Sequence, residues 1–266
     1  MHPILFQIGP YKLHSYGLAV FLAFALGILL GERRARAVGL APGLVMDLSV
    51  WILVSSLLGA RLTYVGAHIG EFRGRWLDII NPFQSDGTIG IAGLVLLGGV
   101  LAAIPVTAWY LKKRRIPLLK MLDILAPSLS FGIAIGRVGC LFNGCCFGRP
   151  TNLPWGMAFP TTCAAGYVFP NQFLQPTQVY EIIYAGLIGF ILLWRTPKQW
   201  FEGELFHWFL LLYGIGRFFN ESVRYYSPKL TLQIGGWQVT GSMVLSLAMA
   251  ATGAVLLWRG FQKVEK

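Results

Sequence analysis

Seven stretches of this 266-residue chain are apolar over roughly the 20 residues that a helix needs to cross a bilayer. Hydrophobic residues make up 55% of the chain, charged residues only 12%, and the mean hydropathy is +0.61. The apolar runs are continuous, whereas barrel strands alternate apolar and polar residues. We therefore predict an all-α integral membrane protein with seven transmembrane helices at residues 15–31, 45–67, 88–110, 120–141, 178–195, 204–224 and 236–258.

Basic residues between these segments predict the orientation, because they are retained on the cytoplasmic side of a membrane. We expect the first segment to remain as a span, since no basic start of a cleavable signal peptide precedes it. Alternate loops and the C-terminal end carry thirteen basic residues, and the other loops carry five. The N-terminus is therefore expected outside and the C-terminus in the cytoplasm, with residues 1–266 as one polytopic membrane domain. Basic loops beside anionic lipid also explain most of the net charge of +11, so no nucleic-acid partner is expected.

The polar residues inside the predicted spans share one depth, in the half of the bilayer that faces outside. An ionised side chain in hydrocarbon costs about 2.5 kcal/mol or more, so such residues usually line a polar cavity. Their shared depth predicts one site open to the outer leaflet; unrelated salt bridges and snorkelling side chains are the alternative. The residues are Tyr16, Arg61, Arg137, Gln178, Glu181 and the stretch from Arg217 to Arg224.

Four polar residues near the end of the sixth span are spaced by four, four and three positions. A helix presents this spacing as one stripe, here made of Tyr213, Arg217, Glu221 and Arg224. An intrahelical pair between Arg217 and Glu221 that only permits burial is the alternative. One carboxylate neutralises one of the two arginines, and the remaining positive charge suits a phosphate.

Glycines surround Arg137 at the end of the fourth span. Gly132, Gly136 and Gly139 would allow close approach of another backbone, and Gly144 suits a turn back into the protein. A helix-packing face with a snorkelling arginine is the alternative reading.

These motifs together resemble the prolipoprotein diacylglyceryl transferase family, and the resemblance extends over nearly the whole chain. The stretch Gly136-Arg137-x-Gly139 to Asn143-Gly144 looks like the family signature. Four further motifs occur in the family's order and spacing: His14-x-Tyr16-Gly17, Gly98-Gly99, Gln175-Pro176-x-Gln178-x-Tyr180-Glu181 and Tyr213-Gly214-x-x-Arg217-x-x-x-Glu221-x-x-Arg224.

The resemblance implies a multi-pass enzyme of the bacterial inner membrane that acts in lipoprotein maturation. Such an enzyme moves the diacylglyceryl group of phosphatidylglycerol onto the lipobox cysteine thiol of a preprolipoprotein. It makes a thioether and releases glycerol phosphate. The implied partners are therefore phosphatidylglycerol, the signal peptide and lipobox of preprolipoproteins, and membrane lipids. The implied catalytic residues are Arg217, Glu221 and Tyr16, and the implied substrate-binding residues are Arg137, Asn143, Tyr213, Arg61, Glu181, Gly98, Gly99 and Arg224.

Three positions depart from the family pattern. Leu97 replaces a histidine often regarded as the base, Cys140 replaces the first asparagine of the signature, and Cys145 replaces its glutamate. The substrate thiol could then be activated by Glu221 or Tyr16, or by arginines that lower its pKa. We favour electrostatic activation by Arg137 and Arg217. A non-enzymatic or retargeted phospholipid-binding relative is the alternative function; a transporter is disfavoured because no internal repeat is visible.

All four cysteines fall within 24 positions on the predicted outer side. A disulfide between Cys163 and one of the others is possible there, and zinc is a rival reading. The spacing of Cys140, Cys145, Cys146 and Cys163 lacks paired C-x-x-C knuckles, so we expect no metal. The sequence has no Walker or dinucleotide-binding motif, so we expect no cofactor such as ATP or NAD. These cysteines lie in or beside residues 142–177, where five prolines interrupt an apolar sequence. We predict that this segment is an ordered, loop-rich outer lobe that covers the site or guides the signal peptide.

Overall fold

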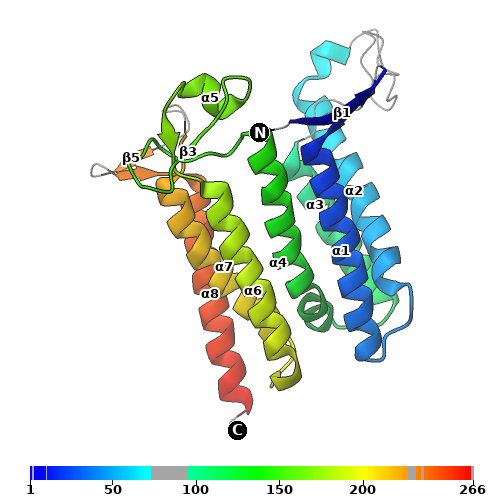
Figure 1. Cartoon of the computed structure of the whole chain (residues 1–266). Helices are drawn as coiled ribbons and strands as arrows, with labels where there is room; N and C mark the ends of the chain where they lie inside the picture. The colour runs from blue at the N-terminus through cyan, green and yellow to red at the C-terminus, as the bar shows by residue number, and fades with distance from the viewer. Residues whose placement is uncertain (2, 10, 73–94, 227–231, 235–236, 265–266) are drawn as a thin grey trace. The chain divides into compact units, whose positions relative to one another are not determined.

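The computed structural model describes the chain except for residues 2, 10, 73–94, 227–231, 235–236 and 265–266. Most of it is helical (Figure 1). The long helices are α1 (Ser15–Ala37), α2 (Leu44–Ala67), α3 (Leu96–Lys113), α4 (Leu118–Asn143), α6 (Thr177–Arg195), α7 (Glu204–Val223) and α8 (Gly241–Val264). The short helical pieces are α5 (Ala164–Val168), η1 (Ile69–Phe72) and η3 (Thr196–Lys198).

The described residues also form three two-stranded antiparallel sheets. They are β1 (Ile4–Ile8) with β2 (Tyr11–His14), β3 (Met157–Ala158) with β4 (Phe173–Leu174), and β5 (Leu232–Ile234) with β6 (Trp237–Val239). Each sheet lies just before a long helix or between two of them along the chain.

In the described part of the chain, five helical segments are long and apolar enough to cross a membrane. They are Ser15–Ala37, Leu44–Ala67, Leu118–Asn143, Thr177–Lys198 and Gly241–Val264. Large apolar side chains on these segments are exposed, such as Phe21 at 66% and Phe190 at 65%. Soluble proteins rarely expose extended apolar surface of this kind, whereas lipid accommodates it. The chain is therefore a helical multi-pass membrane protein, as predicted.

Two of the predicted spans differ from the helices at their N-terminal ends. The span predicted at 236–258 is wrong at its start, because Trp237–Val239 pair with Leu232–Ile234 and α8 begins only at Gly241. Of the span predicted at 88–110, residues 88–94 lie outside the described part, and α3 begins at Leu96. The first predicted span, 15–31, differs at its C-terminal end. Helix α1 continues to Ala37, through basic residues that interact favourably with a helix C-terminus.

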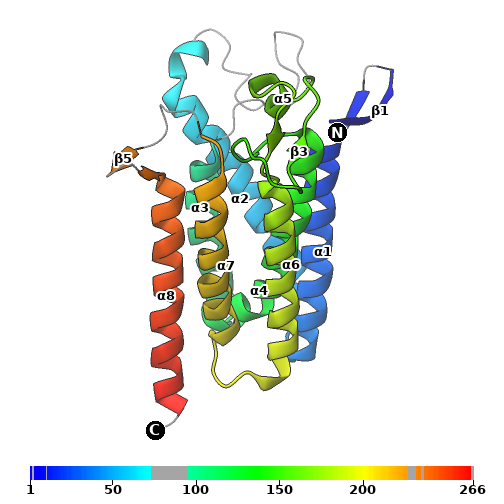
Figure 2. The same cartoon turned by 60° about the vertical axis from the view of Figure 1, so that its left-hand side comes forward.

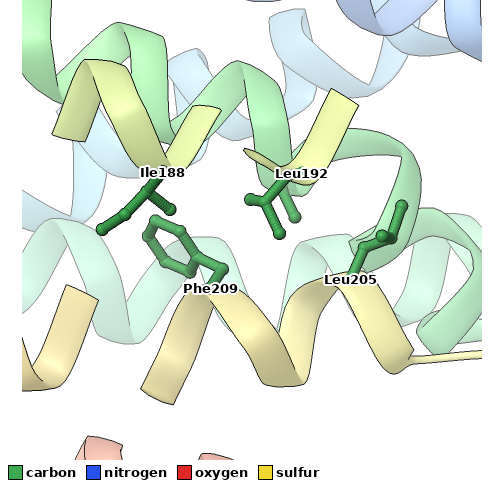
Figure 3. Close-up of a cluster of buried hydrophobic side chains, with 5 residues drawn as sticks. Ile188, Leu192, Leu205 and Phe209 are labelled. Atoms are coloured by element: carbon green, nitrogen blue, oxygen red, sulfur yellow. The ribbon is translucent and has the colours of Figure 1, made fainter. Parts of the chain in front are cut away.

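The chain divides into two compact units, Met1–Gly31 with Leu119–Lys266, and Glu32–Leu118, which are described separately. In the first unit, α7 runs beside both α6 and α8 (Figures 1 and 2). A core of Ala126, Ile188, Leu192, Leu205 and Phe209 joins α4, α6 and α7 (Figure 3). Small residues set the spacing of α7 and α8: a Cβ on Gly214 would lie 2.7 Å from the Ser246 carbonyl oxygen.

The register of α7 is fixed at its N-terminal end by a buried carboxylate from α4. Asp123 accepts hydrogen bonds from the backbone N–H groups of Gly203, at 2.5 Å, and Phe206, at 2.9 Å. These N–H groups have no partner within the helix, so the carboxylate caps it. The polar stripe near the other end of α7 is thereby held at a set height against α4.

Residues 144–176 form a lobe with its own small core at the C-terminal ends of α4 and α7. Its core is Phe147, Phe159, Cys163, Ala165 and Leu174. The lobe is tied to the end of α7 by the backbone: the N–H of Arg149 donates to Val223 O at 2.9 Å, and the N–H of Tyr225 donates to Phe147 O at 3.1 Å. The lobe thus holds the backbone on both sides of Arg224, at Val223 and Tyr225.

Candidate functional site

Glu181, in the first turns of α6, is the centre of a buried polar cluster. Its side chain is 1% exposed. Oε1 accepts a hydrogen bond from the Tyr213 hydroxyl at 2.8 Å, and Oε2 accepts from Arg217 Nη1 at 2.8 Å and Asn220 Nδ2 at 3.0 Å. Arg137 Nε, from α4, lies 3.1 Å from the same Oε2. One carboxylate therefore joins side chains from α4, α6 and α7.

A second buried carboxylate, Glu221, lies on α7 one helical turn after Arg217. Its Oε2 lies 2.8 Å from Arg217 Nη2 and 3.6 Å from Arg224 Nη1. The Tyr226 hydroxyl donates to Oε1. Burial, followed by this hydrogen bond, raises the pKa of Tyr226 above its usual value, so the phenol stays protonated and continues to donate.

The two clusters form one network with an excess of positive charge. Three arginines, Arg137, Arg217 and Arg224, contact two carboxylates, and their side chains are only 18%, 13% and 16% exposed. Removing charges from water is costly unless they are paired, so an unbalanced positive charge here favours binding of an anion. The intrahelical Arg217–Glu221 pair does exist, but Arg217 also binds Glu181 on another helix.

Several buried polar atoms around this network have no hydrogen-bond partner in the part of the chain that the structure describes. They are Gln178 Oε1, Tyr184 Oη and Asn220 Oδ1. Buried polar groups are nearly always hydrogen-bonded, and exceptions often indicate a water molecule or a ligand. Their location beside Glu181 on α6 and α7 fits a ligand with polar groups of its own.

The turn that follows α4 brings three cysteines together. The Sγ atoms of Cys140, Cys145 and Cys146 all lie within 4.8 Å of one another. Arg137 Nη1 lies 4.0 Å from Cys140 Sγ, so this thiol cluster adjoins the arginine network. Cys163 is not a member: it packs against Gly144, and its thiol donates to Pro160 O at 3.1 Å. All four are free thiols, so the disulfide considered for Cys163 is not formed.

The backbone of this turn is held by the start of α6. Gly144 and Cys146 adopt left-handed conformations, with φ of 66° and 63°. Gln178 Nε2 donates to Cys145 O at 2.7 Å, and Thr177 Oγ1 donates to Cys146 O at 2.7 Å. A left-handed conformation is strained for a cysteine and persists only when its surroundings enforce it. The predicted turn at Gly144 is present, with Asn143 as the last residue of α4.

Tyr16 packs on α4 beside this turn. A Cβ on Gly139 would lie 3.2 Å from Tyr16 Cα and 2.7 Å from Ala19 Cβ, so Gly139 allows α1 and α4 to touch. The other two glycines are not needed for a close approach among the described residues: a Cβ on Gly136 would meet no atom within 4 Å, and one on Gly132 would make only an ordinary contact with Ala23 O at 3.9 Å. The Tyr16 side chain remains 46% exposed.

Arg61, Gly98 and Gly99 belong to the second unit, so their part in the site stays a prediction. Arg61 is buried, and its guanidinium lies 5.1 Å from the centre of the Phe72 ring. A Cβ on Gly98 would meet Gly59 O at 2.5 Å, and one on Gly99 would meet Ser56 O at 2.9 Å. The glycine pair therefore has a packing role, because it lets α3 approach α2.

Sequence reasoning missed Asn220 and Tyr226 as members of the network. Asn220 is three residues after Arg217, which places it on the same face of α7, and this spacing could have identified it. Tyr226 lies beyond the end of α7, and no local periodicity predicts that its hydroxyl returns to Glu221.

Comparisons with known proteins give matches over most of the chain. The family model described as prolipoprotein diacylglyceryl transferase matches residues 3–259. Proteins named phosphatidylglycerol–prolipoprotein diacylglyceryl transferase are similar to the chain: that of Verminephrobacter eiseniae is 35% identical over 269 residues, covering 96% of this chain and 91% of the relative. The protein from Nostoc sp. is 34% identical, covering 96% and 88%. That of Clostridium tetani is 30% identical over 84% and 86%. The chain belongs to the prolipoprotein diacylglyceryl transferase family.

Proposed function

We propose that this protein transfers the diacylglyceryl group of phosphatidylglycerol to the lipobox cysteine thiol of preprolipoproteins. The observation that carries the proposal is the convergence of Arg137 and Arg217, from two helices, on one oxygen of Glu181. Together with Arg224 they leave one more positive than negative charge in the network. A phosphodiester carries one negative charge and matches this excess.

The charge distribution suits the bond changes of such a transfer. The thiol sulfur attacks the glyceryl carbon, a C–S bond forms, and the C–O bond to phosphate breaks with its electron pair leaving on glycerol phosphate. The thiol proton is lost. Guanidinium groups already fixed by Glu181 and Glu221 stabilise negative charge that develops on the phosphate without having to reorganise.

We assign the residues the following roles. Arg217 and Glu221 act at the reacting phosphate together with Tyr16, which lies on α1 where this helix packs against α4. Arg137 and Arg224 bind the headgroup, and Glu181 and Tyr213 hold the arginines in place. Asn143 lies at the turn after α4. Arg61, Gly98 and Gly99 are proposed substrate contacts from the second unit. Leu97, at the position of the family histidine, offers no proton acceptor.

The topology proposed with this function has seven spans, an outside N-terminus and a cytoplasmic C-terminus. Residues 1–266 then form one domain of a bacterial inner-membrane protein. The cluster around Glu181 and the lobe of residues 144–176 lie at the same ends of α4, α6 and α7, opposite the basic ends near Arg195. Basic residues are retained in the cytoplasm, so the site would open toward the outer leaflet, where signal peptides emerge.

The experiment is label transfer from radiolabelled phosphatidylglycerol to a lipobox peptide by purified protein in detergent. Wild type should transfer label, and Arg137→Ala and Glu221→Gln should reduce transfer by about 100-fold or more. Arg259→Ala, an exposed arginine near the end of α8, is the matched control and should keep full activity. Wild type that binds the lipid but transfers nothing would contradict the proposal and favour a non-enzymatic phospholipid-binding relative.

A further inference from the structure

The thiol cluster of Cys140, Cys145 and Cys146 has dimensions close to those of a metal site. A tetrahedral ion with sulfur ligands at about 2.3 Å holds pairs of sulfur atoms roughly 3.8 Å apart. The three Sγ atoms here lie within 4.8 Å of one another before any ion contracts them. The difference from the spacing around a bound ion is therefore at most about 1 Å for each pair of sulfur atoms.

The protein holds the cluster in place at some conformational cost. Cys146 has a φ of 63°, and the carbonyl groups of Cys145 and Cys146 accept hydrogen bonds from Gln178 and Thr177, which are each 1% exposed. Buried side chains from another helix thus enforce a strained cysteine conformation. Such strain is typical of functional positions. Packing alone does not require three adjoining thiols in a turn of this kind.

Charge in the neighbourhood also fits a metal–thiolate group. Three thiolates and one divalent cation carry a net charge of −1, and Arg137 Nη1 lies 4.0 Å from Cys140 Sγ. A guanidinium that donates to a ligand sulfur stabilises the thiolate and orients it. The arginines that would repel a bare cation therefore favour the complete anionic complex.

We propose that Cys140, Cys145 and Cys146 bind one thiophilic divalent cation, of which Zn²⁺ is the most suitable, and that its fourth position accepts the substrate thiol. Three protein ligands with an open position are the arrangement of catalytic rather than structural zinc sites. The spacing of the cysteines argued against a metal, because it contains no paired C-x-x-C knuckles. Spacing does not reveal that the turn after α4 folds Cys145 and Cys146 back toward Cys140.

The role of the open position rests on the proposed function. A thiol that binds the ion loses its proton to solvent and becomes a thiolate, which supplies the activation that Leu97 does not. The sulfur lone pair then forms the C–S bond to the glyceryl carbon. The C–O bond breaks, and its electron pair leaves on glycerol phosphate beside Arg137. No oxidant or reductant is required.

The metal site is tested without reference to activity. Protein purified with a phosphine reductant is loaded with Co²⁺ and then Zn²⁺, and sulfur-to-metal charge-transfer absorption and bound metal are measured. We expect one equivalent per chain, and Cys146→Ser should weaken binding by about tenfold or more. Serine keeps the same backbone strain. Cys163→Ser is the matched control and should bind like wild type, because Cys163 lies outside the cluster.

Two results would overturn the site. One is unchanged metal binding by the Cys140→Ser/Cys145→Ser/Cys146→Ser variant. The other is wild-type protein that binds neither Co²⁺ nor Zn²⁺ after full reduction with the phosphine. Thermal unfolding of each metal-free variant identifies any that fail to fold, and the Cys145→Ser and Cys146→Ser single variants provide independent measurements of the same loss.

The open position is tested with the Co²⁺ form and a lipobox peptide. Adding the peptide should increase charge-transfer absorption, and the same peptide with serine in place of its cysteine should not. No change with the cysteine peptide would overturn the proposed substrate thiolate. If wild type binds metal and peptide thiol but transfers no lipid, the proposed function fails while the site stands. If it transfers lipid equally well after chelation, the activating role fails and the function stands.

Discussion

Arg137 on α4 and Arg217 on α7 contact the same atom, Oε2 of Glu181, at 3.1 and 2.8 Å. Two guanidinium groups this close together repel each other, and the negative charge of the carboxylate they share offsets that repulsion. Glu181 is therefore both the link between three helices and the group that makes a cationic binding surface tolerable inside a membrane protein.

Replacing this link should destabilise the fold as well as the site. Glu181→Gln keeps the shape but leaves two buried arginines facing each other, so we expect a loss of about 3–5 kcal/mol in the free energy of unfolding. Thermal unfolding in detergent measures it. Glu202→Gln, at an exposed carboxylate in the turn before α7, is the control and should change little. An unfolding temperature for Glu181→Gln equal to that of wild type would show that the pairing is not needed.

The two neighbouring tyrosines Tyr213 and Tyr184 provide a matched pair. The Tyr213 hydroxyl donates to Glu181 at 2.8 Å, whereas the buried Tyr184 hydroxyl has no partner among the described residues. A hydrogen bond to a charged group contributes about 1.5–3 kcal/mol. Tyr213→Phe should therefore lower the free energy of unfolding by that amount, while Tyr184→Phe should be neutral or slightly stabilising. Equal effects in chemical denaturation would contradict the assignment.

The close approach of α1 to α4 should depend on Gly139 and not on Gly136, one turn earlier in α4. Gly139→Ala places a methyl group 2.7 Å from Ala19 Cβ, and such overpacking costs about 1–3 kcal/mol. Gly136→Ala meets no atom of the described residues within 4 Å and should gain up to about 1 kcal/mol in stability from the higher helix propensity of alanine. The unfolding temperatures of the two variants should move in opposite directions; the same sign for both would be inconsistent with the helix contact.

The Tyr226–Glu221 hydrogen bond should make stability depend on pH in the alkaline range. The pKa of Tyr226 is raised in the folded state, so below the usual phenol pKa of about 10 its contribution to stability is complete. Above that value the unfolded chain loses the proton first, and the contribution falls as pH rises. The difference in unfolding free energy between wild type and Tyr226→Phe should therefore shrink above pH ~10. A difference that stays constant or grows would refute this. In a Glu221→Gln background the pH dependence should be much weaker.

The sequence was sufficient for features that depend on neighbours along the chain. Continuous apolar runs predicted the long helices, and the spacing of Tyr213, Arg217 and Glu221 placed them on one face of α7, where the structure has them. Motifs in register predicted the family that the comparisons show. Helix periodicity and bilayer thickness act over one segment at a time, so a single sequence contains the information they need.

Contacts between segments were decided only by the tertiary structure. The sequence did not predict that Glu181 contacts Arg137 and Arg217, because only the packing of α4, α6 and α7 brings these side chains together. Helix α8 begins later than predicted because β5 pairs with β6. Three cysteines lie together because Thr177 and Gln178 hold the backbone of the turn after α4. A sequence fixes which face of a helix is polar, whereas the crossing of helices determines which polar groups meet.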